Sequence, residues 1–164
     1  MIKSIKHSGF TLIELIITIV ILAVLASAAM PLLQITAQRN KEIELRDNLL
    51  KIRTAIDAYK KAYDDGLLGI KNAEKTGYPP NLEILVEGVE SSNPKIKHKL
   101  KFLRKIPRDP MIDNTEASEL ASEEIWGLRS YDSDPNEPIA GDDVYDVYSL
   151  SPLTGTNGVP YAQW

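Results

Sequence analysis

The chain has 164 residues, with 19 Lys and Arg against 23 Asp and Glu, a formal net charge of −4 and no cysteine. Its length fits one domain together with a membrane helix. The excess of acidic over basic residues argues against general nucleic-acid binding. The lack of cysteine excludes disulfides, thiolate nucleophiles and cysteine-bound metals.

The first predicted element is an apolar helix at residues 10–33, in which Glu14 alone can carry a charge. Its 24 residues exceed the about 20 that cross a bilayer. Lys3 and Lys6 precede it, so the positive-inside rule keeps the short N-terminal end in the cytoplasm and places the rest outside. Small Gly9 lies before the run, the wrong side for an ordinary secretory signal.

A carboxylate in a membrane span costs roughly 2.5–3.5 kcal/mol at the centre, so Glu14 needs an explanation. One interpretation is an interfacial side chain helped by the helix dipole. The other is that cleavage after Gly9 creates an amine on Phe10, which pairs with Glu14 of a neighbouring chain.

The segment GFTLIEL at residues 9–15 resembles the class III signal of type IV pilins and type II secretion pseudopilins. This resemblance implies that residues 1–9 are a leader, removed by a prepilin peptidase that cuts between Gly9 and Phe10 and methylates the new amine. It also implies that Glu14 recruits each subunit into register on a filament. Pro31 matches a proline common in the family, whereas Ala23 stands where many pilins carry glycine.

Residues 34–65 are predicted to continue this helix as an amphipathic segment, bent at Pro31 and stopped at Asp65 and Gly66. Charged pairs four residues apart, such as Glu42 with Arg46, are expected on its exposed side. Apolar side chains at spacings of three and four are expected to face a core: Leu45, Leu49, Ile52, Ile56, Tyr59 and Tyr63.

Residues 66–164 are predicted to form a globular head. A short helix opens at Pro80 or Asn81 and closes at Gly88, and residues 126–131 and 144–150 read as two antiparallel strands. The expected fold class is α+β, a long N-terminal membrane-spanning helix packed on a small antiparallel sheet.

Three segments of the head, YPPNLEILVE, FLRKIPRDP and GDDVYDVYSLSPLTGTNGVPYAQW, resemble the major pseudopilin, the G-type subunit of type II secretion. This implies the pilin fold and a structural subunit of a periplasmic pseudopilus. It implies a single-pass protein of the bacterial inner membrane, with its N-terminus cytoplasmic and its head periplasmic. The implied partners are further copies of the chain, minor pseudopilins, the prepilin peptidase, the inner-membrane assembly platform and, before assembly, the bilayer.

Other functions stay open at this point. They are a subunit of a type IV pilus or competence filament, a membrane-anchored binding protein that does not polymerise, and an anchored enzyme. The sequence has no cysteine, no usable His pair and no phosphate loop, and we expect no catalysis.

Charge is unevenly distributed along the head. Residues 95–108 hold seven Lys and Arg and no acid, whereas residues 109–146 hold twelve Asp and Glu and one Arg. One interpretation is that the basic stretch binds phosphate or an acidic partner. The other is that it is a solvated face whose charges pair with the acidic segment, within a head or between neighbouring subunits. His98 is expected to be an exposed member of the stretch.

Asp132, Asp134 and Asn136 have the spacing of a calcium loop, but Glu137 replaces the required glycine, which argues against an EF-hand. By resemblance, G-type pseudopilins bind calcium in an Asp-rich C-terminal loop. Residues 147–164 contain no acid, so the candidate calcium ligands are Asp142 and Asp143 with backbone carbonyls. No other cofactor is expected.

Overall fold

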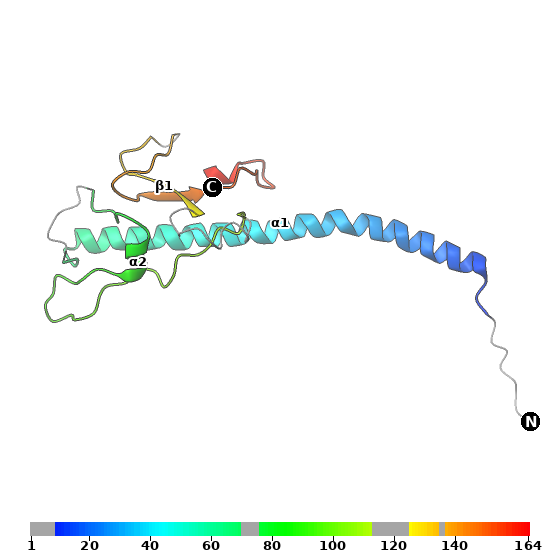
Figure 1. The fold of residues 1–164 in the computed structure, drawn as a ribbon, viewed down its shortest axis with the longest axis horizontal. Helices are drawn as coiled ribbons and strands as arrows, with labels where there is room; N and C mark the ends of the chain where they lie inside the picture. Colours follow the sequence, from blue (N-terminus) through cyan, green and yellow to red (C-terminus); the bar gives the residue numbers. More distant parts are fainter. Residues whose placement is uncertain (1–8, 70–75, 113–124, 135–136) are drawn as a thin grey trace, which may run out of the picture. The chain divides into compact units, whose positions relative to one another are not determined.

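The computed structural model describes residues 9–69, 76–112, 125–134 and 137–164, and for residues 28–32 it describes the backbone alone. It contains α1 (Leu12–Asp64), α2 (Glu83–Glu87), β1 (Trp126–Arg129), β2 (Asp146–Ser149) and a short 3-10 helix, η1 (Tyr161–Gln163) (Figure 1). The chain divides into two compact units, residues 1–39 and 40–164. A long N-terminal helix and a small antiparallel sheet confirm the α+β class.

The helix α1 ends where the sequence predicts. Gly66 has a φ of 68°, its amide donates to the Tyr63 carbonyl, and the Leu67 amide donates to the Ala62 carbonyl. These two bonds form a Schellman motif, which needs a residue in the left-handed region and therefore favours glycine.

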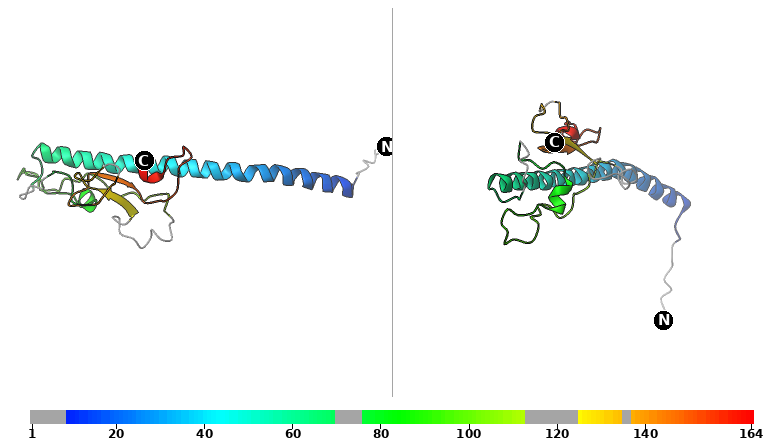
Figure 2. Two further views of the ribbon diagram at one scale, coloured as in Figure 1. Left: turned by 90° about the horizontal axis from the view of Figure 1, so that it is seen from above. Right: turned by 60° about the vertical axis from the view of Figure 1, so that its left-hand side comes forward.

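The predicted apolar stripe of α1 is the core of the second unit. Leu45, Leu49, Ile52, Ile56 and Tyr59 are buried, and Tyr63 packs against them partly exposed. Around them lie buried side chains from the rest of the unit, namely Leu68, Leu82, Leu85, Ile125, Trp126, Val144, Val147 and Tyr161. Figure 1 shows the sheet above this part of α1 and the segment around α2 below it, and Figure 2 gives two further views.

Both predicted strands are present but shorter than predicted. β1 pairs antiparallel with β2, with Trp126 opposite Ser149 and Arg129 opposite Asp146. After Arg129 the chain turns away, because the Ser130 amide donates to the Ile139 carbonyl instead. Gly127 permits the close pairing, since a Cβ there would lie 2.3 Å from the Tyr148 ring.

The short helix α2 begins two to three residues later than predicted. The Asn81 side chain accepts a hydrogen bond from the Ile84 amide at 3.0 Å, which satisfies an amide at the start of the helix. Gly88 closes the helix with a φ of 79°. Residues 89–95, predicted as a loop, also make isolated β-bridges from Val89 to Leu100 and from Ser91 to Leu68.

Candidate functional site

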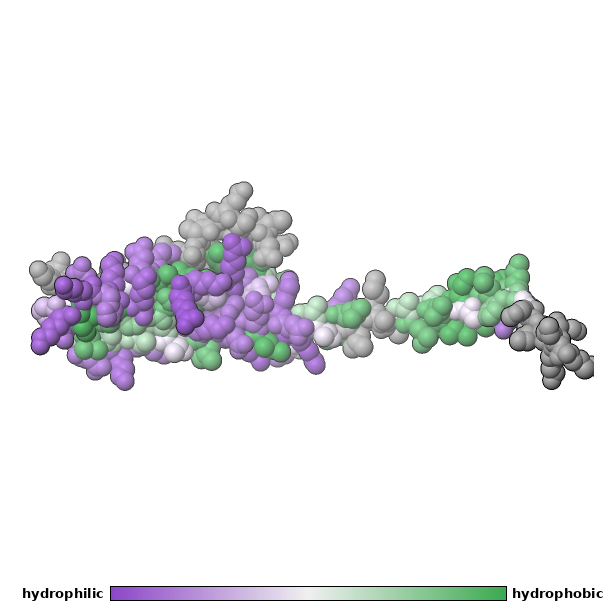
Figure 3. All heavy atoms as spheres, turned by 90° about the horizontal axis from the view of Figure 1, so that it is seen from below, coloured by the Kyte–Doolittle hydropathy of each residue, from purple (hydrophilic) through white to green (hydrophobic). Residues whose placement is uncertain are grey.

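The N-terminal part of α1 exposes its side chains on every side. All side chains of residues 9–27 are exposed, including that of Phe10, which is 70% exposed. Figure 3 shows hydrophobic side chains along this part of the helix. A helix that is apolar all round is stable only against lipid or other helices, so these residues need an environment that the single chain does not supply.

Glu14 lies in the first turn of α1 and takes part in no ion pair among the described residues. Its amide donates to the Thr11 hydroxyl at 3.4 Å, so Thr11 and Glu14 hold the two positions of a capping box. The carboxylate is exposed and available to a group outside the chain.

Gly9 and Pro31 also lie in this first unit. A Cβ on Gly9 would meet nothing within 4 Å, so no neighbour in the described structure requires glycine there. Pro31 lies within α1, and its side chain is outside the described part. None of the helices searched among the described residues combines the length and the apolar character that a bilayer span requires. The membrane span at residues 10–33 therefore stays a prediction.

The C-terminal loop, residues 150–164, is held on α1 by Glu42. This side chain is only 5% exposed, so the prediction that it lies on the exposed side of α1 is wrong. Its carboxylate accepts hydrogen bonds from the Thr156 amide at 2.7 Å, the Thr156 hydroxyl at 2.6 Å and the Tyr161 hydroxyl at 3.0 Å. Hydrogen bonds to a charged acceptor are the stronger kind, so Glu42 fixes the loop to the helix.

Two arginines of α1 complete this attachment. The Arg53 guanidinium donates to Asp146 at 2.7 Å and to the main-chain oxygens of Val147 at 3.0 Å and Trp164 at 2.8 Å. The Arg46 guanidinium lies 4.2 Å from the centre of the Trp164 ring, a cation–π contact. Arg46 thus contacts the end of the loop.

The segment FLRKIPRDP joins α1 to both strands. The Pro107 carbonyl accepts from the Trp126 indole at 2.9 Å, and the Arg108 carbonyl accepts from the Asn48 side chain at 3.0 Å. The Asp109 carboxylate accepts from the Ser149 hydroxyl at 2.5 Å and the Met111 amide at 2.8 Å. Burial raises the pKa of Asp109 above its ordinary value, against the effect of these two bonds.

Asp143, one of the two candidate calcium ligands, instead joins three segments of the head. It accepts hydrogen bonds from the Thr76 hydroxyl, from the Ser130 hydroxyl at 2.8 Å and from the Tyr131 amide at 2.9 Å. Burial alone would raise the pKa of this carboxyl, but the three hydrogen bonds outweigh it and hold the pKa below its ordinary value.

These contacts do not fit a calcium site, which takes six to eight oxygen ligands. Asp142 is exposed, and both oxygens of Asp143 already accept hydrogen bonds. Within the described residues no three His, Cys, Asp or Glu side chains come close enough to hold a metal ion. Asn136, from the calcium-loop spacing, lies outside the described residues.

The basic stretch lies partly along a groove beside α1. The groove encloses about 710 Å³, and Lys51, Asn48 and Glu44 of α1 line it together with residues 102–108. His98 is exposed, as predicted. Among the described residues no ion pair involves residues 95–108, so their charges are not neutralised by a described acid of the same head.

Comparison with known proteins identifies the class. Residues 5–30 match the model of the prokaryotic N-terminal methylation motif, the signature of prepilin-type proteins. The chain is 30% identical over 106 residues to the type II secretion system core protein G of Pseudomonas aeruginosa, covering 64% of this chain and 68% of that protein. It is 26% identical over 105 residues to the protein of the same name from Vibrio cholerae, covering 64% and 66%.

The chain therefore belongs to the family of type II secretion system core protein G, the major pseudopilins. No solved structure matches it.

Proposed function

We propose that the chain is a structural subunit of the periplasmic pseudopilus of a type II secretion system. Membership of the core protein G family supports the secretion system. The observation that carries the polymeric role is the exposed apolar surface of residues 9–27, which a neighbouring helix of the same kind would cover. The core of buried side chains belongs to the second unit, residues 40–164, and does not include this surface.

In this proposal a prepilin peptidase cleaves between Gly9 and Phe10 and methylates the Phe10 amine. The methylation motif at residues 5–30 supports the processing. Glycine at position 9 has no structural requirement among the described residues, which favours a role in recognition by the peptidase.

Before assembly the subunit is anchored in the inner membrane by residues 10–33, and its head lies in the periplasm. Glu14 pairs with the Phe10 amine of a neighbouring subunit, a contact supported by its exposed carboxylate. Pro31 contributes to the assembled helix. The further partners are minor pseudopilins and the inner-membrane assembly platform. The relatives are secretion-system core proteins, which supports a subunit without enzymatic activity.

The decisive test is deletion of the gene in its own host. We expect loss of type II substrates from the culture supernatant, with surface pili and DNA uptake unchanged, and recovery on complementation. Normal secretion with loss of surface pili or DNA uptake would instead identify a pilus or competence subunit. Mass spectrometry of the mature protein should show an N-methylated Phe10 start, and an intact Met1 terminus in cells with an active prepilin peptidase would contradict the proposed processing.

A further inference from the structure

A basic loop, residues 95–101, projects from the head. Lys95, Lys97, Lys99 and Lys101 are all exposed, and Ile96 among them is 36% exposed. No described acid of the same chain forms an ion pair with these lysines. The loop therefore presents four cations and an apolar side chain to the outside.

An acidic loop, residues 131–142, has the opposite charge and is described at 131–134 and 137–142. Asp132, Glu137 and Asp142 are exposed and form no ion pair among the described residues. Between them Ile139 is 64% exposed and Tyr131 is 55% exposed. The loop carries acids and no base, and like the basic loop it adds apolar surface to the charge.

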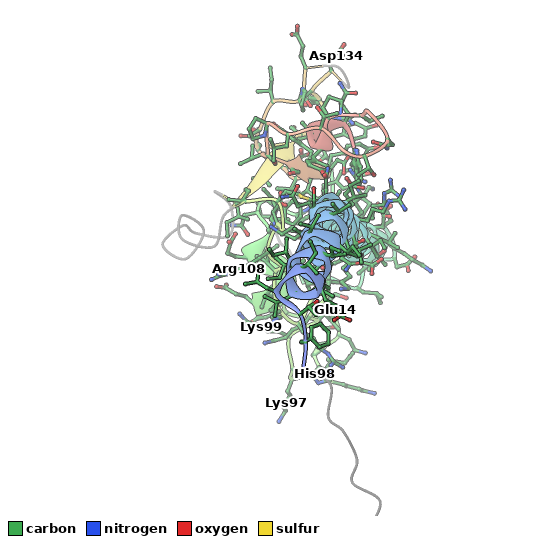
Figure 4. All side chains as sticks on the ribbon, turned by 90° about the vertical axis from the view of Figure 1, so that its right-hand side faces the viewer. Glu14, Lys97, His98, Lys99, Arg108 and Asp134 are labelled. Carbon is green, nitrogen blue, oxygen red and sulfur yellow. The ribbon has the colours of Figure 1, made fainter. Side chains whose placement is uncertain are left out.

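The two loops lie on opposite sides of one compact unit. In Figure 4 Lys97, His98 and Lys99 are at one end of the head and Asp134 is at the other. Both loops belong to the unit formed by residues 40–164. Among the described residues no ion pair joins the two loops of one head.

We infer that the basic loop of each subunit docks onto the acidic loop of the next copy of the chain. The inference rests on the proposed function and names a contact between heads within the filament. Two complementary patches on opposite sides of one molecule make a heterologous contact, which does not close as a two-fold dimer and continues into an open filament when its rotation does not close a ring.

The chemistry of the loops favours a second copy over other partners. A phosphate-rich or anionic lipid surface would satisfy the basic loop and leave the acidic loop without a partner, whereas a second copy of the chain supplies the opposite charge to both loops. Ile96 of one loop and Ile139 of the other supply an apolar centre, with the charged side chains as a rim. Charges placed in this way set the register and the choice of partner more than the strength of the contact.

The test is charge reversal and charge exchange in the full chain, in its host. The basic-loop variant carries K97E and K99E, and the acidic-loop variant carries D132K and E137K. Each variant alone places like charges face to face, and we expect crosslinked multimers and secretion to fall on the order of tenfold. The chain carrying all four changes should recover most of both, because every contact again joins opposite charges.

A matched control for the basic-loop variant carries K41E and K61E. These two changes alter the net charge by the same amount as K97E and K99E, at exposed positions of α1 outside both loops. This control should assemble normally. Because the chain has no cysteine, K97C and E137C can be introduced into separate co-expressed chains without background disulfides. A bis-maleimide reagent should then join the two chains.

Three results would overturn the inference: normal assembly in both single-loop variants, no recovery in the exchanged chain, or no crosslink between K97C and E137C. Failure of the proposed function is distinguishable, because then even the unchanged chain forms no multimers and its deletion leaves secretion intact. Thermal melting of each variant separates lost assembly from lost folding, and all the changed side chains are exposed.

Discussion

Replacing Glu42 with alanine tests how the C-terminal loop is held on α1. The substitution removes three hydrogen bonds that join the helix to Thr156 and Tyr161, which lie 114 and 119 positions further along the chain. Tyr161 is buried, so losing the carboxylate acceptor of its hydroxyl costs about 1–3 kcal/mol. Thr156 is exposed, so water replaces part of its two bonds. We expect the free energy of unfolding to fall by about 2–4 kcal/mol.

The assay is urea unfolding of the full chain in mild detergent, followed by the fluorescence of Trp126 and Trp164. With a denaturant slope of about 1–3 kcal/mol per M, the midpoint should fall by roughly 1 M or more. E42Q keeps the shape and part of the acceptor capacity, so its midpoint should lie between those of E42A and the unchanged chain. E44A is the matched control, because Glu44 is exposed and two residues away. Equal midpoints for E42A and E44A would refute the role of Glu42.

The remaining predictions concern the rest of the head. The lowered pKa of Asp143 contributes stability that is present above the ordinary carboxyl pKa and is lost as pH falls through the lowered pKa. D143N removes this contribution, so the stability of the variant should depend less on pH in acid. An unchanged acid unfolding curve would contradict this. G127A should destabilise by about 1–3 kcal/mol, because its Cβ would collide with the Tyr148 ring. Chemical unfolding measures the loss, and an unchanged midpoint would show that the ring moves aside without cost. Millimolar calcium should leave the thermal midpoint unchanged, and a rise would show that Asp142 or other groups do bind the ion.

The sequence predicts well those elements that short-range patterns determine. The apolar stripe from Leu45 to Tyr59 fixes the buried face of α1, because its spacing follows the helix period. Aromatic and β-branched residues place both strands, and Asp65 and Gly66 place the end of the helix within a residue. The family resemblance rests on motifs of the same local kind.

The contacts of Glu42 and Asp143 were missed because their partners are distant in sequence. Local spacing favours a pair between Glu42 and Arg46, whereas Thr156 lies 114 residues away. One signal was available, because Glu42 lies three residues before Leu45 and therefore extends the apolar stripe toward the N-terminus. For Asp143 no such signal exists, since its donor Thr76 comes from a loop 67 residues earlier. Nor could the charge pattern show that the two charged loops lie on opposite sides of the head.

The central claim is that Glu14 sets the register of neighbouring subunits in a filament, and helix crosslinking tests it most directly. If Glu14 pairs with the Phe10 amine, adjacent helices are offset by four residues, so a chain with I17C should crosslink to a co-expressed chain with I21C in preference to a second I17C. In the E14A background we expect this preference, the filament and secretion to be lost, while membrane insertion stays intact or improves. Normal crosslinking with normal secretion in E14A would show that Glu14 is a tolerated helix-capping residue and would contradict the account.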